Sequence, residues 1–204
     1  MSEKTCAILL KGDFDGKICG DFIICADAGT SLANKLNITP DIIIGDMDSR
    51  SDNSFENVEN LKYSPEKDFT DGELCILYAK EHGFEKVNIY GAEGGSLDHI
   101  FCNVDLLKRA FELGMKAVCY LHNGTVELIS GLFKRKNIKG KRISLVPYGY
   151  EAHIKYTDGL KYKISDSTVL RLGNMGLGLS NVAIEDEITI MVEKGAVLYF
   201  ELKK

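Results

Sequence analysis

Residues 41 to 49, which read Asp41-Ile42-Ile43-Ile44-Gly45-Asp46-Met47-Asp48-Ser49, decide the fold of this chain. Three successive isoleucines between polar residues are typical of a short strand that is buried on both faces. Such strands occur in parallel sheets that helices cover on both sides. The two carboxylates that follow therefore fall at the carboxyl end of a strand, where open α/β sheets bind their ligands.

The same pattern of apolar strands and helices extends through the first 123 residues. Further strands are predicted at Cys6–Leu10, Phe22–Ala26, Val87–Tyr90 and Ala117–Leu121. Helical spacing is found at Thr70–Glu81 and at Leu97–Leu113, where one face carries Leu97, Ile100, Phe101, Val104, Leu107 and Phe111. Alternation of strands and helices predicts an α/β sheet with crossover connections.

The pattern changes after the turn signal His122-Asn123-Gly124. Short strands separated by glycine and aspartate turns follow, without a convincing helix. They are expected at Thr125–Ile129, Arg142–Val146, His153–Tyr156, Val169–Leu172, Glu187–Val192 and Ala196–Glu201. We therefore predict two domains, residues 1–123 of α/β type and residues 124–204 as a small all-β sandwich.

Composition and charge exclude several classes of function. The chain has 204 residues, 45% of them apolar, and a net charge of −5. Residues 1–123 carry 21 acidic and 12 basic side chains, and such an acidic surface disfavours duplex nucleic acid as a partner. No apolar stretch approaches the length of a membrane span, and the six cysteines lack C-x-x-C spacing. We expect a soluble protein of the reducing cytoplasm.

Asp46 and Asp48 are the first candidates for chemistry. In an extended segment both carboxylates point the same way and can share one hard cation, for which Mg²⁺ is the natural choice. A solvated turn, or a helix N-cap formed by Asp48 or Ser49, is the structural alternative. Two close carboxylates repel each other unless a cation or a proton intervenes, which favours the metal.

The segment Lys67-Asp68-Phe69-Thr70-Asp71-Gly72-Glu73 brings further carboxylates to the start of a predicted helix. Thr70 and Glu73 have the spacing of a capping box, so Thr70 is equally well explained as a helix cap or as a functional residue. Asp71 is a third metal ligand or a general base, provided that the fold brings it to Asp46 and Asp48.

The loop Gly91-Ala92-Glu93-Gly94-Gly95 lies between a predicted strand and an amphipathic helix. In that position, main-chain N–H groups and the helix N-terminus can hold phosphate. A purely structural turn remains open, since neither a Walker A sequence nor G-x-G-x-x-G is present.

Taken together, the motifs resemble those of the thiamin pyrophosphokinase family, in order and in spacing, over nearly the whole chain. They are Ala26-Asp27-Ala28-Gly29, Pro40–Ser49, Lys67–Asp71, Gly94-Gly95-Ser96-Leu97-Asp98-His99, Ile143–Pro147, Gly159-Leu160-Lys161-Tyr162 and Leu179-Ser180-Asn181.

The resemblance implies an N-terminal Rossmann-like, mostly parallel catalytic domain and a C-terminal β-sandwich that binds thiamin, working as a homodimer. It implies transfer of pyrophosphate from Mg-ATP to the hydroxyl of thiamin, giving thiamin diphosphate and AMP. By motif, Mg²⁺ is assigned to Asp46, Asp48 and Asp71. The nucleotide site is assigned to Asp27, Gly29, Thr70, Gly94, Gly95, Ser96 and Asp98, and thiamin to Tyr162, Ser180 and Asn181, with the tyrosine ring stacking on the thiazolium cation.

Two departures from the family pattern bear on this assignment. Ser96 stands where the family often has Arg, which removes a bidentate phosphate donor, and Tyr162 stands where Trp is common. Two other functions remain open: a phosphohydrolase with Asp46 as nucleophile and Asp48 as acid, and a noncatalytic sensor of thiamin or nucleotide.

Overall fold

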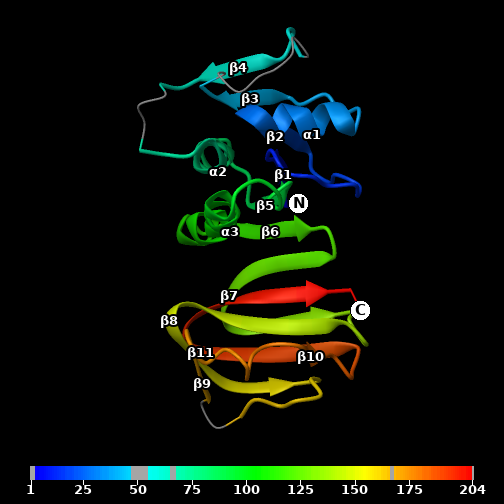
Figure 1. Ribbon diagram of the computed structural model, residues 1–204, viewed down its shortest axis with the longest axis vertical. Coiled ribbons are helices and arrows are strands. Elements are labelled where there is room, and N and C mark those ends of the chain that lie inside the picture. The colour runs from blue at the N-terminus through cyan, green and yellow to red at the C-terminus, as the bar shows by residue number, and fades with distance from the viewer. Residues whose placement is uncertain (1–2, 47–54, 65–67, 166–167, 204) are drawn as a thin grey trace. The chain divides into compact units, whose positions relative to one another are not determined.

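The computed structural model describes residues 3–46, 55–64, 68–165 and 168–203 (Figure 1). The chain divides into two compact units, Met1–His122 and Asn123–Lys204. The division falls inside the predicted turn at residues 122–124.

Among the described residues of the first unit, six strands form a sheet in which every neighbouring pair is parallel. They are β1 (Thr5–Leu9), β2 (Phe22–Ala26), β3 (Ile42–Gly45), β4 (Glu59–Lys62), β5 (Lys86–Tyr90) and β6 (Lys116–Leu121). Their order across the sheet is β6-β5-β1-β2-β3-β4. The five predicted strands are confirmed to within one residue at each end. Strand β4 was not predicted, because three of its four residues are exposed and polar, as suits the edge of a sheet.

This sheet is covered by the α-helices α1 (Thr30–Lys35), α2 (Asp71–Glu81) and α3 (Leu97–Glu112). Leu32 and Ala33 of α1 pack on one face of the sheet against Leu9 and Tyr90. Phe22, whose side chain points to the opposite face, stacks on Tyr78 of α2.

Helix α3 buries a different set of residues from the predicted apolar face. Its buried residues are Leu106, Leu107 and Ala110. Leu97 and Phe101 are 68% and 69% exposed, so most of the predicted face does not belong to the core.

The second unit is all-β, and its strand pairs are antiparallel. It contains β7 (Gly124–Lys136), β8 (Arg142–Asp158), β9 (Thr168–Arg171), β10 (Asn181–Val182) and β11 (Glu187–Leu202). The order is β10-β8-β11-β7, and β9 pairs with β8.

Two predicted pairs of short strands are in fact two long ones, β8 and β11. Gly149 and Gly195, which lie between the predicted short strands, do not end β8 and β11. They adopt φ values of 91° and 79°, which glycine tolerates, and the register of β11 against β8 shifts next to Gly195. The mixed α/β, sheet-dominated fold is thus confirmed, while the predicted breaks in β8 and β11 were wrong.

Candidate active site

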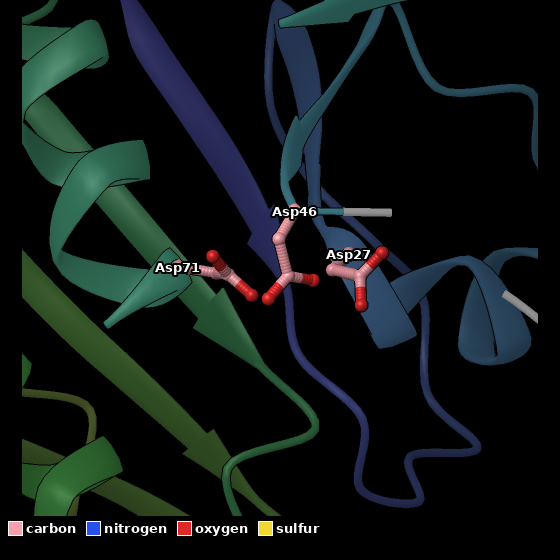
Figure 2. A group of neighbouring side chains, drawn as sticks. All are labelled: Asp27, Asp46 and Asp71. Atoms are coloured by element: carbon pink, nitrogen blue, oxygen red, sulfur yellow. The ribbon is translucent and has the colours of Figure 1, made fainter. Parts of the chain in front are cut away.

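Three carboxylates from separate segments meet at the carboxyl edge of the parallel sheet. Asp27 follows β2, Asp46 follows β3, and Asp71 is the first residue of α2. One oxygen from each lies within 4.8 Å of the others, and Figure 2 shows the Asp46 carboxylate between those of Asp71 and Asp27. Asp27 is 3% exposed, and the other two are half-buried. Two neighbouring strand ends and the start of a helix thus bring together residues that lie up to 44 positions apart in the sequence.

The absence of a side chain at Gly45 permits this approach. A Cβ atom built on Gly45 would lie 2.6 Å from the Cβ of Asp27 and 3.1 Å from the Cγ of Asp71. Both carboxylate-bearing residues therefore rest against the glycine. Asp27 itself has a φ of 30°, a left-handed conformation that costs a non-glycine residue about 1–3 kcal/mol.

Asp71 is positioned by the capping box at the start of α2. The Glu73 N–H donates to the Thr70 hydroxyl at 3.2 Å, and the Thr70 N–H donates to a Glu73 carboxylate oxygen at 2.8 Å. The helix-cap explanation of Thr70 is thereby confirmed. Its contact with nucleotide stays a prediction, and the cap fixes the first turn from which Asp71 projects.

Electrostatics favour a cation between these carboxylates. Two ionised carboxylates no more than 4.8 Å apart repel each other by about 3.5 kcal/mol or more at an effective dielectric constant of 20. A divalent cation or a proton relieves that repulsion. In an octahedral Mg²⁺ site the ligand oxygens are separated by about 3 to 4 Å. The three aspartates fit such a site with small movements of their side chains.

The carboxylates that meet here match the predicted ligand set only in part. Asp46 and Asp71, two of the three predicted ligands, are close together, and the third carboxylate beside them is Asp27, which the sequence analysis had placed in the nucleotide site. Asp48, together with Met47 and Ser49, lies outside the described residues. The sequence did hold a signal for Asp27, since this residue follows a predicted strand, as Asp46 does.

The glycine-rich loop after β5 lies beside the segment after β1. The Leu10 N–H donates to the Tyr90 carbonyl, and the Gly12 N–H donates to the Gly91 carbonyl, both at 2.9 Å. Gly94 and Gly95 have φ values of 107° and 82°. Strands β1 and β5 are neighbours, but β1 is followed by β2 on one side of the pair and β5 is followed by β6 on the other. Open α/β sheets bind their ligands at such a topological switch point.

Ser96 and Asp98 interact at the end of this loop. Ser96 occupies the N-cap position of α3, and its side chain does not cap the helix. A hydrogen bond from the Ser96 side chain, assisted by the His99 main chain, lowers the pKa of the Asp98 carboxyl group. Asp98 is therefore ionised at neutral pH, and together with Glu93 it gives the loop a negative charge.

Gly29 has a structural reason to be glycine. A Cβ atom there would lie 2.0 Å from the Leu9 carbonyl oxygen, so the turn after β2 packs directly on β1. A contact of Gly29 with nucleotide remains a prediction.

The three residues predicted to bind thiamin lie together in the second unit. The Asn181 side chain accepts a hydrogen bond from the Tyr162 N–H at 3.0 Å and donates to the Tyr162 carbonyl at 2.7 Å. Asn181 is 4% exposed, whereas Tyr162 is 59% exposed. The Ser180 N–H donates to the Ser144 hydroxyl at 3.0 Å, and Ser180 has a φ of 58°. Asn181 thus holds the segment that presents the tyrosine ring.

This fold and site are typical of α/β enzymes that act on phosphate groups, in which carboxylates and a glycine-rich loop share the carboxyl edge of the sheet. Family models match residues 19–119 as the thiamin pyrophosphokinase catalytic domain and residues 132–197 as the thiamin pyrophosphokinase vitamin B1 binding domain. The chain belongs to the thiamin pyrophosphokinase family, which is a family of enzymes.

Individual relatives agree with the family models. The thiamine pyrophosphokinase of Bacillus subtilis is 27% identical over 182 residues, covering 86% of this chain and 84% of the relative. Thiamine pyrophosphokinase 1 of Arabidopsis thaliana is 25% identical, covering 89% and 78%.

Solved structures share the fold. The crystal structure of the Bacillus subtilis protein has a TM-score of 0.83 at 22% identity, covering 98% of this chain and all of the other. The yeast thiamin pyrophosphokinase structure has a TM-score of 0.83 at 16% identity, covering 100% and 87%. Within the described residues, no helix has the length and apolar character that crossing a membrane requires.

Proposed function

We propose that this chain transfers a pyrophosphoryl group from Mg-ATP to the hydroxyl group of thiamin, giving thiamin diphosphate and AMP. The observation that carries the proposal is the meeting of Asp27, Asp46 and Asp71 at the carboxyl edge of the sheet, in a chain of this family. The comparisons do not favour the phosphohydrolase or the noncatalytic sensor. A sensor also gains nothing from three clustered carboxylates that repel one another.

The carboxylates would hold Mg²⁺. Both the sequence and the geometry support Asp46 and Asp71 as ligands. The geometry alone supports Asp27, and the sequence alone supports Asp48. Bound there, Mg²⁺ supplies positive charge that stabilises the phosphate oxygens during transfer. The main-chain N–H groups around Gly94 and Gly95 would orient the phosphates for in-line attack at the β-phosphorus. Asp71 would accept the proton of the thiamin hydroxyl, in a state in which it does not coordinate the metal.

In this proposal the second unit supplies the thiamin site. The exposed ring of Tyr162 would stack on the thiazolium cation, and Ser180 and Asn181 would shape the neighbouring segment. We further propose that the enzyme is a cytoplasmic homodimer and that its first unit is Rossmann-like.

The second unit is proposed to be a sandwich in which β8 and β11 each contribute to both layers. Ile143 and Ile154, from the two halves of β8, belong to one buried cluster. Ile190 and Tyr199, from the two halves of β11, belong to the same cluster. Strands that bend at Gly149 and Gly195 can cover both sides of a shared core.

Incubation of the purified chain with thiamin, ATP and Mg²⁺ tests the reaction. Equal amounts of AMP and thiamin diphosphate are expected, and ADP as the product would refute the proposal. Asp46→Asn should abolish most turnover, because it removes a charge from the proposed metal site. Glu81→Gln, which removes a carboxylate at the other end of α2, is the matched control and should retain turnover. Near-normal turnover of Asp46→Asn would contradict the assigned site.

A further inference from the structure

The segment after β1 brings a lysine to the glycine-rich loop. A Cβ atom built on Gly12 would lie 1.7 Å from the Glu93 carbonyl oxygen, and one built on Gly94 would lie 3.4 Å from the Gly12 Cα. The two main chains are therefore in direct contact. Lys11 immediately precedes Gly12, and its side chain is exposed.

The region around the glycine-rich loop has an excess of negative charge. The loop itself contributes Glu93 and Asp98, the Ser96 side chain is neutral, and the three aspartates of the candidate active site occupy the same edge of the sheet. A polyphosphate that entered this region would meet carboxylates on two sides. Bound Mg²⁺ offsets only part of that charge, so a further positive group within reach would strengthen phosphate binding.

Lys11 is available for that role. It makes no ion pair within the part of the chain that the structure describes. The nearest acidic residue in its own segment, Asp13, is already bound to Lys35 at 2.8 Å, and this pair lowers the pKa of Asp13. The ammonium group of a lysine on its flexible four-carbon stem suits a phosphate oxygen as a compact point charge.

We propose that Lys11 binds the polyphosphate of the nucleotide at the switch point between β1 and β5, supplying the positive charge that the loop at Gly91–Asp98 lacks. This inference rests on the proposed function, since it assumes a nucleotide substrate. Lys11 acts on binding: it neutralises phosphate charge in the ground state and in the transition state alike. Its loss should therefore raise the KM for ATP and leave kcat nearly unchanged.

The test replaces Lys11 by Met, which keeps most of the unbranched stem of the side chain and removes the charge. Because a charged hydrogen bond to phosphate is lost, we expect the KM for ATP to rise about tenfold or more, with kcat within about twofold. Lys11→Arg should retain most of the affinity. Lys4→Met is the matched control: Lys4 is exposed, makes no ion pair among the described residues, and lies about 20 Å away at the other end of β1.

Two inhibitors separate phosphate contacts from general damage to the site. The inhibition constant of inorganic tripolyphosphate should rise in Lys11→Met in parallel with the KM for ATP, while that of adenosine, which has no phosphate, should stay the same. Equal weakening of both would indicate a distorted site and would overturn the proposal, as would an unchanged KM for ATP.

A positive charge placed at Ser96, in the glycine-rich loop, provides a gain-of-function test. Ser96→Arg introduced into Lys11→Met should restore part of the affinity for ATP, because it returns a cation to the same phosphate. Calorimetric binding of ATP to each variant does not require turnover. If the wild-type chain binds ATP but forms no AMP, the proposed function fails while the role of Lys11 is still measured. Identical ATP affinity of wild type and Lys11→Met would refute the role of Lys11 alone.

Discussion

Adding a single methyl group at Gly45 should lower both the free energy of unfolding and the rate of catalysis, and the two effects can be measured separately. In Gly45→Ala the new Cβ would stand 2.6 Å from the Asp27 Cβ, whereas ordinary contact begins at 3.4 Å. Asp27 or the main chain at Gly45 must therefore move to widen this contact by 0.8 Å, and the φ of 158° at Gly45 adds backbone strain. Overpacking of this kind costs about 1–3 kcal/mol of unfolding free energy. A displacement of about 1 Å at a catalytic group can lower the rate about 100-fold.

Urea denaturation and turnover with saturating Mg²⁺ measure the two effects. Gly83→Ala is the matched control, because Gly83 has a φ of 78° but no atom within 4 Å of the position that the new methyl group would take. It should lose about 1 kcal/mol of stability through backbone strain and keep its kcat. If Gly45→Ala were as active as Gly83→Ala at equal stability, the packing of Gly45 would not set the geometry of the carboxylates.

Four further outcomes follow from the structure. Thr70→Val should lower the unfolding free energy by about 1 kcal/mol through loss of the α2 cap, and Thr70→Ser should restore it, as measured by urea denaturation. Asn181→Ala should cost about 1–3 kcal/mol in the same assay, because main-chain N–H groups at Tyr162 and Val182 lose their acceptor. Mg²⁺ should raise the thermal midpoint of the wild-type chain and have a much smaller effect on Asp46→Asn, since a ligand that binds the folded state stabilises it. Iodoacetamide at pH 8 should modify the exposed thiols of Cys19 and Cys102 and spare the buried thiols of Cys6, Cys25, Cys75 and Cys119, as measured by peptide mass spectrometry. Burial raises the pKa of Cys6 and of Cys119 to about 12.

The first unit was predictable because its strands are short, apolar and buried on both faces. Ile42–Ile44 illustrates this, since three β-branched residues in succession leave few alternatives. Strand β4 has no such pattern: its Glu59 and Lys62 are exposed, and only pairing with β3 makes it a strand. In the second unit, the stretches that contain Gly149 and Gly195 were interpreted as turns between strands, because a turn and a bulge have the same local signature in sequence.

The location of the candidate site could be predicted better than the set of residues that form it. Asp46 and Asp71 follow from strand ends and helix starts, which local patterns reveal. The proximity of Asp27 to both depends on the order of strands in the sheet, which no local pattern contains. Lys11 was missed for a related reason: it also follows an apolar strand, but its relation to Gly94 arises from contact between two loops that are distant in sequence.

The cluster of aspartates is better explained by chemistry than by stability. It places like charges within 4.8 Å of one another, and it holds Asp27 in a left-handed conformation with a φ of 30°. Both features oppose folding, and they persist only where the surrounding structure enforces them. Here the enforcement comes from the packing of Gly45, the pairing of β2 with β3 and the capping box before Asp71. Three separate structural features therefore hold one energetically unfavourable arrangement, which indicates that the carboxylates serve to bind a ligand.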